Sequence, residues 1–396
     1  MRPAASRLVI IAAFAATRLW SAEPTPRVPP TRPVTSTMAA PAATAPISPT
    51  SAKLAALPIV RIGGQEFVST REVAALLGWK TTWVEATRRL TLFDPTNKVE
   101  LTAGGREISV NGLRLFLGNS AMLHGGVVHI SKTDLQRCLL PQLRPAFLGT
   151  LLGRPRVVVI DPGHGGQDNG MENKPLKLKE KVLTLDVALR LKKLLEARGY
   201  AVILTRTDDR MLGPDKQSDF TTRKQADFMT RWDITNRAKA DLFVSIHFNS
   251  LYPDTKTSGT EIYTFTRAGQ RSDPGWGFGA KDDAEPTPSE INRFDPWSSL
   301  LAQSLHREVI RTLRTNDRGQ KTMHLAVLRG LKCPAVLVES VFLSNTAEAR
   351  LAATPAYLQQ IAEGLASGIG VYADALGQLP PKPVAPPAVT PPSSKP

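Results

Sequence analysis

A run of four apolar β-forming residues, 157–160, leads directly into the sequence DPGHGGQDNG. Such a run predicts a buried strand, and the glycines behind it predict a tight turn at the carboxyl end of that strand. In α/β proteins, binding sites form outside the carboxyl ends of the strands. The turn therefore puts the imidazole of His164 where functional side chains are expected, although a lone histidine in a turn is more often structural.

Strands and helices alternate along the rest of residues 156–376. Short apolar runs predict further strands at 201–205, 242–246, 261–265 and 336–341. Apolar residues at helical spacing predict a helix over 183–197, which ends before Gly199, and a closing helix over 357–372. This alternation predicts an α/β fold, with a mostly parallel twisted sheet covered by helices on both faces.

The composition changes sharply near both ends of the chain. Residues 1–22 combine an early positive charge at Arg2 with a short apolar stretch, which predicts a signal peptide. Residues 23–56 form a Pro/Thr/Ala-rich linker, and residues 377–396 form a Pro-rich tail that we expect to be disordered. Because the apolar stretch is too short to cross a bilayer, we expect an exported protein of the periplasm or cell envelope, without a transmembrane anchor.

The overall charge and the cysteine count bear on partners and compartment. A net charge of +15 favours contact with an anionic surface. The sequence contains no motif typical of nucleic-acid binding, so we expect no nucleic-acid partner. The two cysteines, Cys138 and Cys333, leave one disulfide open in an exported chain, and we favour two buried thiols.

Residues 57–145 contain two similar copies of a short pattern. Paired glycines precede FVSTREV in the first copy and HISKTDL in the second. Each copy predicts a turn, a short strand and a helix, with Ser69 or Ser131 as the N-cap. These residues predict a small α+β domain, which a linker over 146–155 joins to the next domain. The pattern resembles the copper amine oxidase N-terminal-like (stalk) domain of exported bacterial envelope proteins, and copper chemistry is not implied.

Two further residues lie in contexts that bring them close to His164. Glu180 opens the first predicted helix, next to the glycine-rich turn, and His247 ends the strand of the segment DLFVSIHFNS. Two imidazoles and one carboxylate suit Zn²⁺, which accepts nitrogen and oxygen ligands, and three protein ligands leave a fourth position for water. Water at such a position ionises near neutral pH and becomes a strong nucleophile. The sequence therefore predicts a catalytic metal site at His164, Glu180 and His247.

Glu339 is the fourth residue of this predicted site. It is the only charged residue in the apolar run CPAVLVESVFL, which predicts a buried strand. A buried carboxylate without a partner is costly, so its presence calls for a nearby metal, cation or water. We interpret Glu339 as a general base that takes a proton from water and passes it to a leaving amine.

With these residues in place, residues 156–376 resemble the zinc-dependent N-acetylmuramoyl-L-alanine amidases of the amidase 3 type. The motifs DPGHGGQDNG, LTRTDDR, RAKADLFVSIHFN and PAVLVESVFLSN occur in order. The resemblance implies one Zn²⁺ held by His164, Glu180 and His247, with Glu339 as the catalytic residue. It implies that the substrate is peptidoglycan, cleaved at the amide between the lactyl group of N-acetylmuramic acid and L-alanine during wall remodelling or cell separation.

Other positions carry weaker predictions. Asn249, close behind His247, is a candidate for orienting a metal ligand or the substrate, with a structural role as an equal alternative. Arg206 is a candidate substrate contact, but an ion pair that braces the fold is favoured for it. Family members usually have glycine after the catalytic glutamate, where this chain has Ser340. An insertion over residues 266–296 predicts a variable surface loop. Some relatives block the zinc with a carboxylate from such a segment, so Glu285 or Glu290 is a second hypothesis, as a regulatory gate.

Two alternatives to the amidase remain at this stage. One is a zinc peptidase that cuts the peptidoglycan stem itself, and the other is an inactive wall-binding regulator that keeps the fold. The presence of the three predicted metal ligands and of Glu339 favours an active amidase. We expect a monomer, and the resemblance leaves an activator protein open as a partner.

Overall fold

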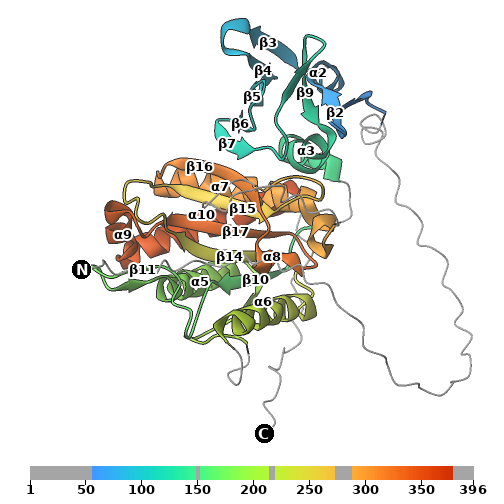
Figure 1. The fold of residues 1–396 in the computed structure, drawn as a ribbon. Coiled ribbons are helices and arrows are strands. Elements are labelled where there is room, and N and C mark those ends of the chain that lie inside the picture. Colours follow the sequence, from blue (N-terminus) through green and yellow to red (C-terminus); the bar gives the residue numbers. More distant parts are fainter. Residues whose placement is uncertain (1–55, 149–151, 214–218, 273–287, 378–396) are drawn as a thin grey trace, which may run out of the picture.

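The computed structural model describes residues 56–148, 152–213, 219–272 and 288–377 (Figure 1). Several predicted features lie outside the described residues: the signal peptide, residues 23–55 of the linker, Glu285 and the tail from residue 378. The described part consists of a larger α/β module and a smaller N-terminal module that packs against one edge of the larger sheet.

The larger module is built on six strands of one sheet. In spatial order they are β13 (Ala201–Leu204), β10 (Val157–Pro162), β14 (Leu242–Asn249), β17 (Ala335–Phe342), β15 (Thr260–Phe265) and β16 (Asp317–Met323). The first four run parallel to one another, whereas β15 runs antiparallel to β17 and parallel to β16. The prediction of a mostly parallel sheet is confirmed. Strand β15 is antiparallel because the loop between β14 and β15 contains no crossover helix. Such a helix would return the chain to the end of the sheet where the parallel strands begin.

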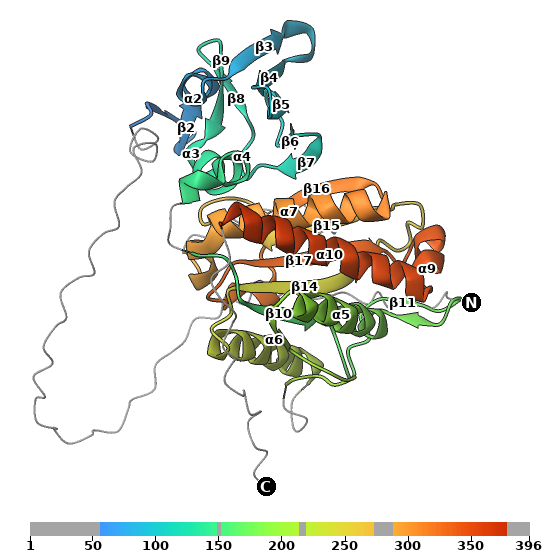
Figure 2. The same ribbon diagram turned by 180° about the vertical axis from the view of Figure 1, so that it is seen from behind.

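Helices cover both faces of this sheet, as predicted. One face packs against α5 (Glu180–Ala197), α7 (Asp295–Leu313) and α10 (Pro355–Ala375), which Figure 2 shows in front of the strands. The opposite face packs against α6 (Phe220–Arg237) and the short α8 (Ala326–Arg329), seen in Figure 1. Both faces of β10 are therefore buried, which is why residues 157–160 are all apolar and do not alternate with polar residues. The helix α9 (Thr346–Ala352) and a small hairpin, β11 (Glu172–Asn173) and β12 (Leu178–Lys179), complete the module.

The N-terminal module has the turn, strand and helix of each predicted copy. In the first copy, β2 (Gln65–Ser69) leads into α2 (Thr70–Leu77), and Ser69 Oγ accepts a hydrogen bond from the Arg71 amide at 3.1 Å. In the second, β9 (Val127–Ser131) leads into a helical segment whose N-cap, Ser131, accepts from the Asp134 amide at 3.0 Å. The remaining elements are β1 (Ile59–Ile62), β3 (Lys80–Val84), β4 (Arg89–Phe93), β5 (Lys98–Thr102), β6 (Glu107–Val110), β7 (Leu113–Phe116), β8 (Met122–His124), α3 (Lys132–Asp134) and α4 (Leu140–Leu143).

The two modules share a sheet. Strand β7 pairs in parallel with β16, with Leu115 opposite Gln320, so that the strands β3 to β7 continue the sheet of the larger module. A buried Gln142 side chain donates to Gln320 Oε1 at 3.0 Å across this junction. A second contact pairs buried Asp134 with Arg267 at 3.3 Å. The N-terminal module is thus packed firmly onto the larger one.

Two smaller expectations concern the thiols and the membrane. Cys138 and Cys333 are both buried and are not joined in a disulfide, which confirms the prediction of two buried thiols. Within the described ranges, none of the helices has the length and apolar character needed to cross a bilayer.

Candidate metal centre

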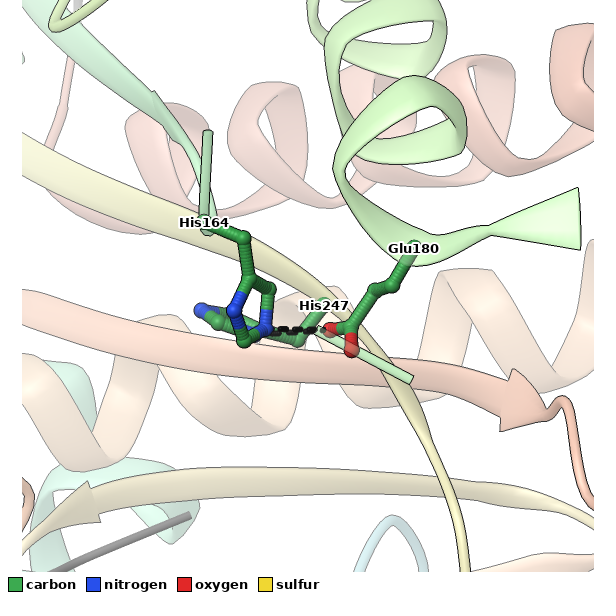
Figure 3. Close-up of side chains that lie close together, drawn as sticks. All are labelled: His164, Glu180 and His247. Carbon is green, nitrogen blue, oxygen red and sulfur yellow. Dashed lines mark hydrogen bonds and ion pairs between the residues drawn. The ribbon is translucent and has the colours of Figure 1, made fainter. Parts of the chain in front are cut away.

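The structure brings His164, Glu180 and His247 together at the carboxyl edge of the parallel strands (Figure 3). Each offers one candidate ligand atom, and these atoms all lie within 4.8 Å of one another. Glu180 Oε1 lies 3.0 Å from His164 Nε2 and 2.9 Å from His247 Nδ1. Residues that are far apart in the sequence therefore form one compact, mostly buried cluster.

Local backbone structure sets the position of each member of the cluster. His164 follows β10 with a left-handed φ of 64°, Glu180 is the first residue of α5, and His247 lies within β14. Space around the cluster is tight at Gly163, where a Cβ atom would lie 2.3 Å from the His247 ring. Gly170, with a φ of 64°, is equally constrained, since a Cβ there would lie 2.5 Å from Glu180 Oε2. The glycines of the turn are thus needed for side chains to approach so closely.

Hydrogen bonds orient the cluster from outside. Asp168 Oδ2 lies 2.9 Å from His164 Nδ1 and also contacts the ammonium of Lys224, which leaves His164 Nε2 facing the centre. The carboxylate of Glu180 accepts hydrogen bonds from two backbone amides, those of Met171 at 2.8 Å and Phe248 at 3.0 Å. Carboxylate partners of this kind fix the tautomer of a metal-binding histidine and make it a better ligand.

Charges within the cluster shift its pKa values in opposite directions. Burial lowers the pKa of His164, but the carboxylates of Glu180 and Asp168 outweigh this and raise it to about 9. Burial also lowers the pKa of His247, which keeps that imidazole neutral. For Glu180, burial would raise the pKa, but His164 and His247 hold it below its ordinary value. The cluster thus contains a carboxylate anion between two imidazoles.

The cluster fits a divalent metal ion. His164 Nε2 is buried and has no well-directed hydrogen bond among the described residues; its one close polar neighbour is Glu180 Oε1, another candidate ligand atom, at 3.0 Å. Buried polar atoms are rarely left without a partner. Two nitrogen donors and one carboxylate are the donor set of catalytic zinc sites, and such a set is poorly suited to Mg²⁺ or Ca²⁺, which prefer oxygen.

Glu339 lies on the strand next to that of His247. The two residues are register partners in the parallel pair formed by β14 and β17. Glu339 Oε2 is buried and has no hydrogen-bond partner among the described residues. Burial, reinforced by the negative charges of Glu180 and Glu261, raises the pKa of Glu339 well above its ordinary value. This carboxyl group is therefore suited to accept and hold a proton.

The structure also reveals a buried charge cluster beside Glu339 that the sequence analysis did not single out. Glu261 on β15 is the register partner of Glu339 across the antiparallel pair. Its carboxylate binds Arg318 at 2.6 Å and Lys321 at 2.9 Å and accepts a hydrogen bond from the Tyr263 hydroxyl. Glu261 is the only carboxylate in the largely apolar strand TEIYTF. The same kind of pattern identified Glu339 in the sequence, so it could also have identified Glu261.

The residues with weaker predictions lie outside the His164, Glu180 and His247 cluster. Asn249 is buried, and its Oδ1 accepts from the Ser250 amide at 2.8 Å. Arg206 is also buried, and it donates to the carbonyls of Pro162 and Gly163 at 3.0 and 2.8 Å. These contacts agree with the structural role favoured for Arg206, and its contact with substrate stays a prediction.

The remaining two positions lie in the insertion and on β17. Glu290 begins a 3₁₀ helix, Glu290–Phe294, where its side chain is 58% exposed and lies 4.0 Å from Arg293. A gate formed by Glu290 or Glu285 stays a prediction. Ser340, where the family usually has glycine, is buried in β17, and its carbonyl accepts from the Thr260 hydroxyl at 2.7 Å.

A covered α/β sheet with a buried His-Glu-His cluster and an adjacent carboxyl group is an arrangement typical of metal-dependent hydrolases. Comparison with known families then specifies the class. Residues 158–371 match the family model of N-acetylmuramoyl-L-alanine amidase, and residues 48–137 match that of the copper amine oxidase N-terminal domain. Because the first match covers more than half of the chain, this protein belongs to the N-acetylmuramoyl-L-alanine amidase family.

Two curated relatives agree with this assignment. The chain is 29% identical over 226 residues to the germination-specific N-acetylmuramoyl-L-alanine amidase of Bacillus subtilis, covering 57% of this chain and 83% of that protein. It is 29% identical over 265 residues to the amidase AmiC of Escherichia coli O6:H1, covering 61% of this chain but only 59% of the relative. Among solved structures, the CwlD amidase of Clostridioides difficile, in complex with the GerS lipoprotein, matches at 28% identity with a TM-score of 0.46, over 55% of this chain and 98% of that chain.

Proposed function

We propose that this protein is a zinc-dependent N-acetylmuramoyl-L-alanine amidase. Its substrate is peptidoglycan, and its reaction is hydrolysis of the amide that joins the lactyl group of N-acetylmuramic acid to L-alanine. One observation carries the proposal: two imidazoles and a carboxylate meet within 4.8 Å, and the adjacent strand carries Glu339, whose buried Oε2 has no hydrogen-bond partner among the described residues. Family membership supplies the substrate class.

The ligands of the zinc would be His164, Glu180 and His247, with His164 binding through the Nε2 atom that Asp168 leaves facing the centre. When bound, Zn²⁺ supplies a Lewis acid that polarises the amide carbonyl and makes water more acidic. The protein contributes a site whose ligands are already oriented by their own hydrogen bonds, so that little reorganisation accompanies binding.

Glu339 would move the proton. It takes a proton from the water that attacks the amide carbonyl and then delivers it to the nitrogen of L-alanine as the C–N bond breaks. The products are the lactyl carboxylic acid on the glycan and a stem peptide with a free amino terminus. The raised pKa of Glu339 matches this role, because the residue must hold the proton between the two steps.

The remaining parts of the proposal concern location and partners. The features of residues 1–22 support export to the periplasm or cell envelope, where peptidoglycan lies. A solved relative is bound to a lipoprotein, which supports an activator as a partner of this chain. We propose wall remodelling or cell separation as the occasion of the reaction.

Digestion of purified peptidoglycan tests the reaction. The chain without residues 1–22, loaded with zinc, is incubated with sacculi, and the soluble products are resolved by mass. We expect stem peptides that begin with L-alanine and glycan strands that keep the complete lactyl group, and we expect a chelator to stop their release. Products cut within the stem would identify a peptidase, and no release after zinc is restored would identify an inactive wall-binding protein.

A further inference from the structure

Two buried guanidinium groups lie directly beneath the loop that carries His164. Arg206 follows β13 and Arg231 lies on α6, and each is 2% exposed. They approach residues 162–164 from two different elements, and their hydrogen bonds there go to backbone carbonyls and not to the side chains of the three candidate metal ligands. We call this pair the arginine clamp.

The arginine clamp binds three consecutive carbonyl groups. The Pro162 carbonyl accepts from Arg231 Nη1 and from Arg206 Nε, both at 3.0 Å. The next carbonyl, that of Gly163, accepts from Arg206 Nη2 at 2.8 Å, and the carbonyl of His164 accepts from Arg231 Nη2 at 2.8 Å. Hydrogen bonds from a charged donor are roughly twice as strong as neutral ones. Four such bonds fix the direction of every peptide unit from Pro162 to His164.

This fixation matters because His164 has an unfavourable backbone conformation. Its φ of 64° lies in the left-handed region, which costs a non-glycine residue on the order of 1 kcal/mol. Without external support, the loop would relax toward conformations that point the imidazole away from Glu180. The carbonyl bonds of the arginine clamp oppose that relaxation.

The charges of the arginine clamp are balanced without the metal ligands. Arg231 pairs with Asp161 at 2.5 Å and with Asp227 at 2.7 Å. Burial would raise the pKa of Asp161, but Arg231 and the hydroxyls of Ser245 and Thr205 lower it to about 2, so it stays anionic. Burial lowers the pKa of Arg206 to about 10, which still leaves it protonated at neutral pH. Two cations therefore face two carboxylates, and the cluster is neutral as a whole.

We infer that Arg206 and Arg231 are positioning residues for the metal site. They hold residues 162–164 in the conformation that the bound metal requires, so that metal binding does not have to order the loop. This inference rests on the proposed metal site, but it makes no use of the amidase reaction. Metal affinity, measured without substrate, is therefore its proper readout.

The test compares Zn²⁺ affinity in the full chain and its Arg231→Lys variant by competition with a chromogenic chelator. Lysine keeps the charge but cannot reach two carbonyls at once. We expect the affinity to fall by about 10- to 100-fold, the range seen when outer contacts of a metal site are lost. We also expect the visible spectrum of the Co²⁺-loaded chain to change. Arg237→Lys is the matched control on the same helix, because Arg237 is 61% exposed and pairs only with surface Asp233 among the described residues.

A double-mutant cycle with His164→Ala separates positioning from general structural support. If Arg231 acts by placing His164, then Arg231→Lys causes no further loss of Zn²⁺ affinity once His164 has been removed. An equal loss in both backgrounds, or no loss in either, would overturn the inference. If the native chain cleaves peptidoglycan but the variants bind Zn²⁺ as tightly as it does, only the positioning role of the arginine clamp is rejected. If the Zn²⁺ affinities change as expected but the native chain does not cleave peptidoglycan, only the proposed amidase activity is rejected.

A second variant keeps the test decisive if Arg231→Lys does not fold. Thr184 donates to the Gly163 carbonyl at 2.9 Å and accepts from Arg206 Nη2 at 3.0 Å. Thr184→Val removes these contacts without changing charge or volume greatly. We expect a several-fold loss of Zn²⁺ affinity that disappears in the His164→Ala background, and an affinity equal to that of the native chain would overturn the inference.

Discussion

The two sides of the candidate site are built in opposite ways. On the metal-ligand side, Asp168 holds His164, two backbone amides hold Glu180, and the arginine clamp holds the loop between them. On the other side, Glu339 has a carboxyl oxygen with no hydrogen-bond partner among the described residues. A metal ligand must stay in place, whereas a base must change its protonation state. Hydrogen bonds hold the candidate ligands in place, but Glu339 Oε2 receives none from the described residues.

This difference has an energetic cost that falls mainly on the side of Glu339. A buried carboxyl oxygen without a hydrogen bond destabilises the folded state, typically by about 1–3 kcal/mol, and Glu339 Oε2 finds no such bond among the described residues. On the ligand side, His164 Nε2 has at least the Glu180 carboxylate 3.0 Å away. Proteins commonly keep such strained groups at functional sites. The absence of a hydrogen bond at Glu339 Oε2 from any described residue therefore supports the role that we propose for this residue.

The largest effect is expected for Glu339→Gln. Because the amide can neither take nor deliver the proton, hydrolysis of sacculi should fall by about 10²- to 10⁴-fold. Zinc content should stay unchanged, and thermal stability should stay equal or rise, since glutamine carries no charge to bury. Activity is measured by release of soluble stem peptides. If the variant kept most of the activity, Glu339 would not be the residue that moves the proton.

Metal binding should stabilise the folded chain, and this stabilisation should depend on the three candidate ligands. Zinc at 100 times its Kd would add about 2.7 kcal/mol to the free energy of unfolding. The melting temperature of the native chain should therefore rise on addition of zinc and fall back with a chelator. In His247→Ala this rise should vanish, because one of three ligands is missing. A zinc-dependent rise of equal size in His247→Ala would show that the metal binds elsewhere.

A smaller effect is expected at the contact that orients His164. Asp168→Asn weakens the hold on Nδ1 but leaves all three ligands, so Zn²⁺ affinity should fall by about 10- to 100-fold. Asp186→Asn on α5 is a suitable control, because Asp186 is partly exposed and bonds Arg190 on the surface of the same helix. If both variants bind zinc as tightly as the native chain, the hydrogen bonds of the ligand side do not contribute to affinity.

The effect furthest from the metal site is expected at Asp295, a buried carboxyl group that does have partners. Burial raises its pKa to about 6, even though Asn292 and Arg137 bond it at the junction of the modules. Between pH 4 and 6 the folded chain thus binds more protons here than the unfolded chain, so its free energy of unfolding falls as pH rises through this window. The change is roughly 3 kcal/mol at most. Asp295→Asn should flatten this slope in urea titrations, and an unchanged slope would show that Asp295 is ionised throughout.

Much of the fold and the core of the site could be predicted because the signals are local. Continuous apolar runs identified β10, β14 and β17, and His247 and Glu339 stood out because each is a polar residue within such a run. His164 and Glu180 were identified by their places at a strand end and a helix start. The glycine-rich turn between them gave the same indication.

The features that were missed depend on packing between distant segments. Nothing in the sequence of α6 distinguishes buried Arg231 from an arginine on the surface, because its partners lie on β10 and in the His164 loop. Strand β16 was not predicted either, since its sequence DRGQKTM lacks an apolar run. Its polar side chains find partners only after folding, as when Asp317 meets buried His306 at 2.6 Å.

Metal analysis of three purified chains tests whether the metal ligands and the proton carrier are separate residues. We predict one zinc ion in the native chain, one in Glu339→Gln and none in His247→Ala, after dialysis against a weak chelator. Such a result would separate the residues that hold the metal from the residue that moves the proton. A full equivalent of zinc in His247→Ala, or its absence from Glu339→Gln, would contradict the division of roles on which the mechanism depends.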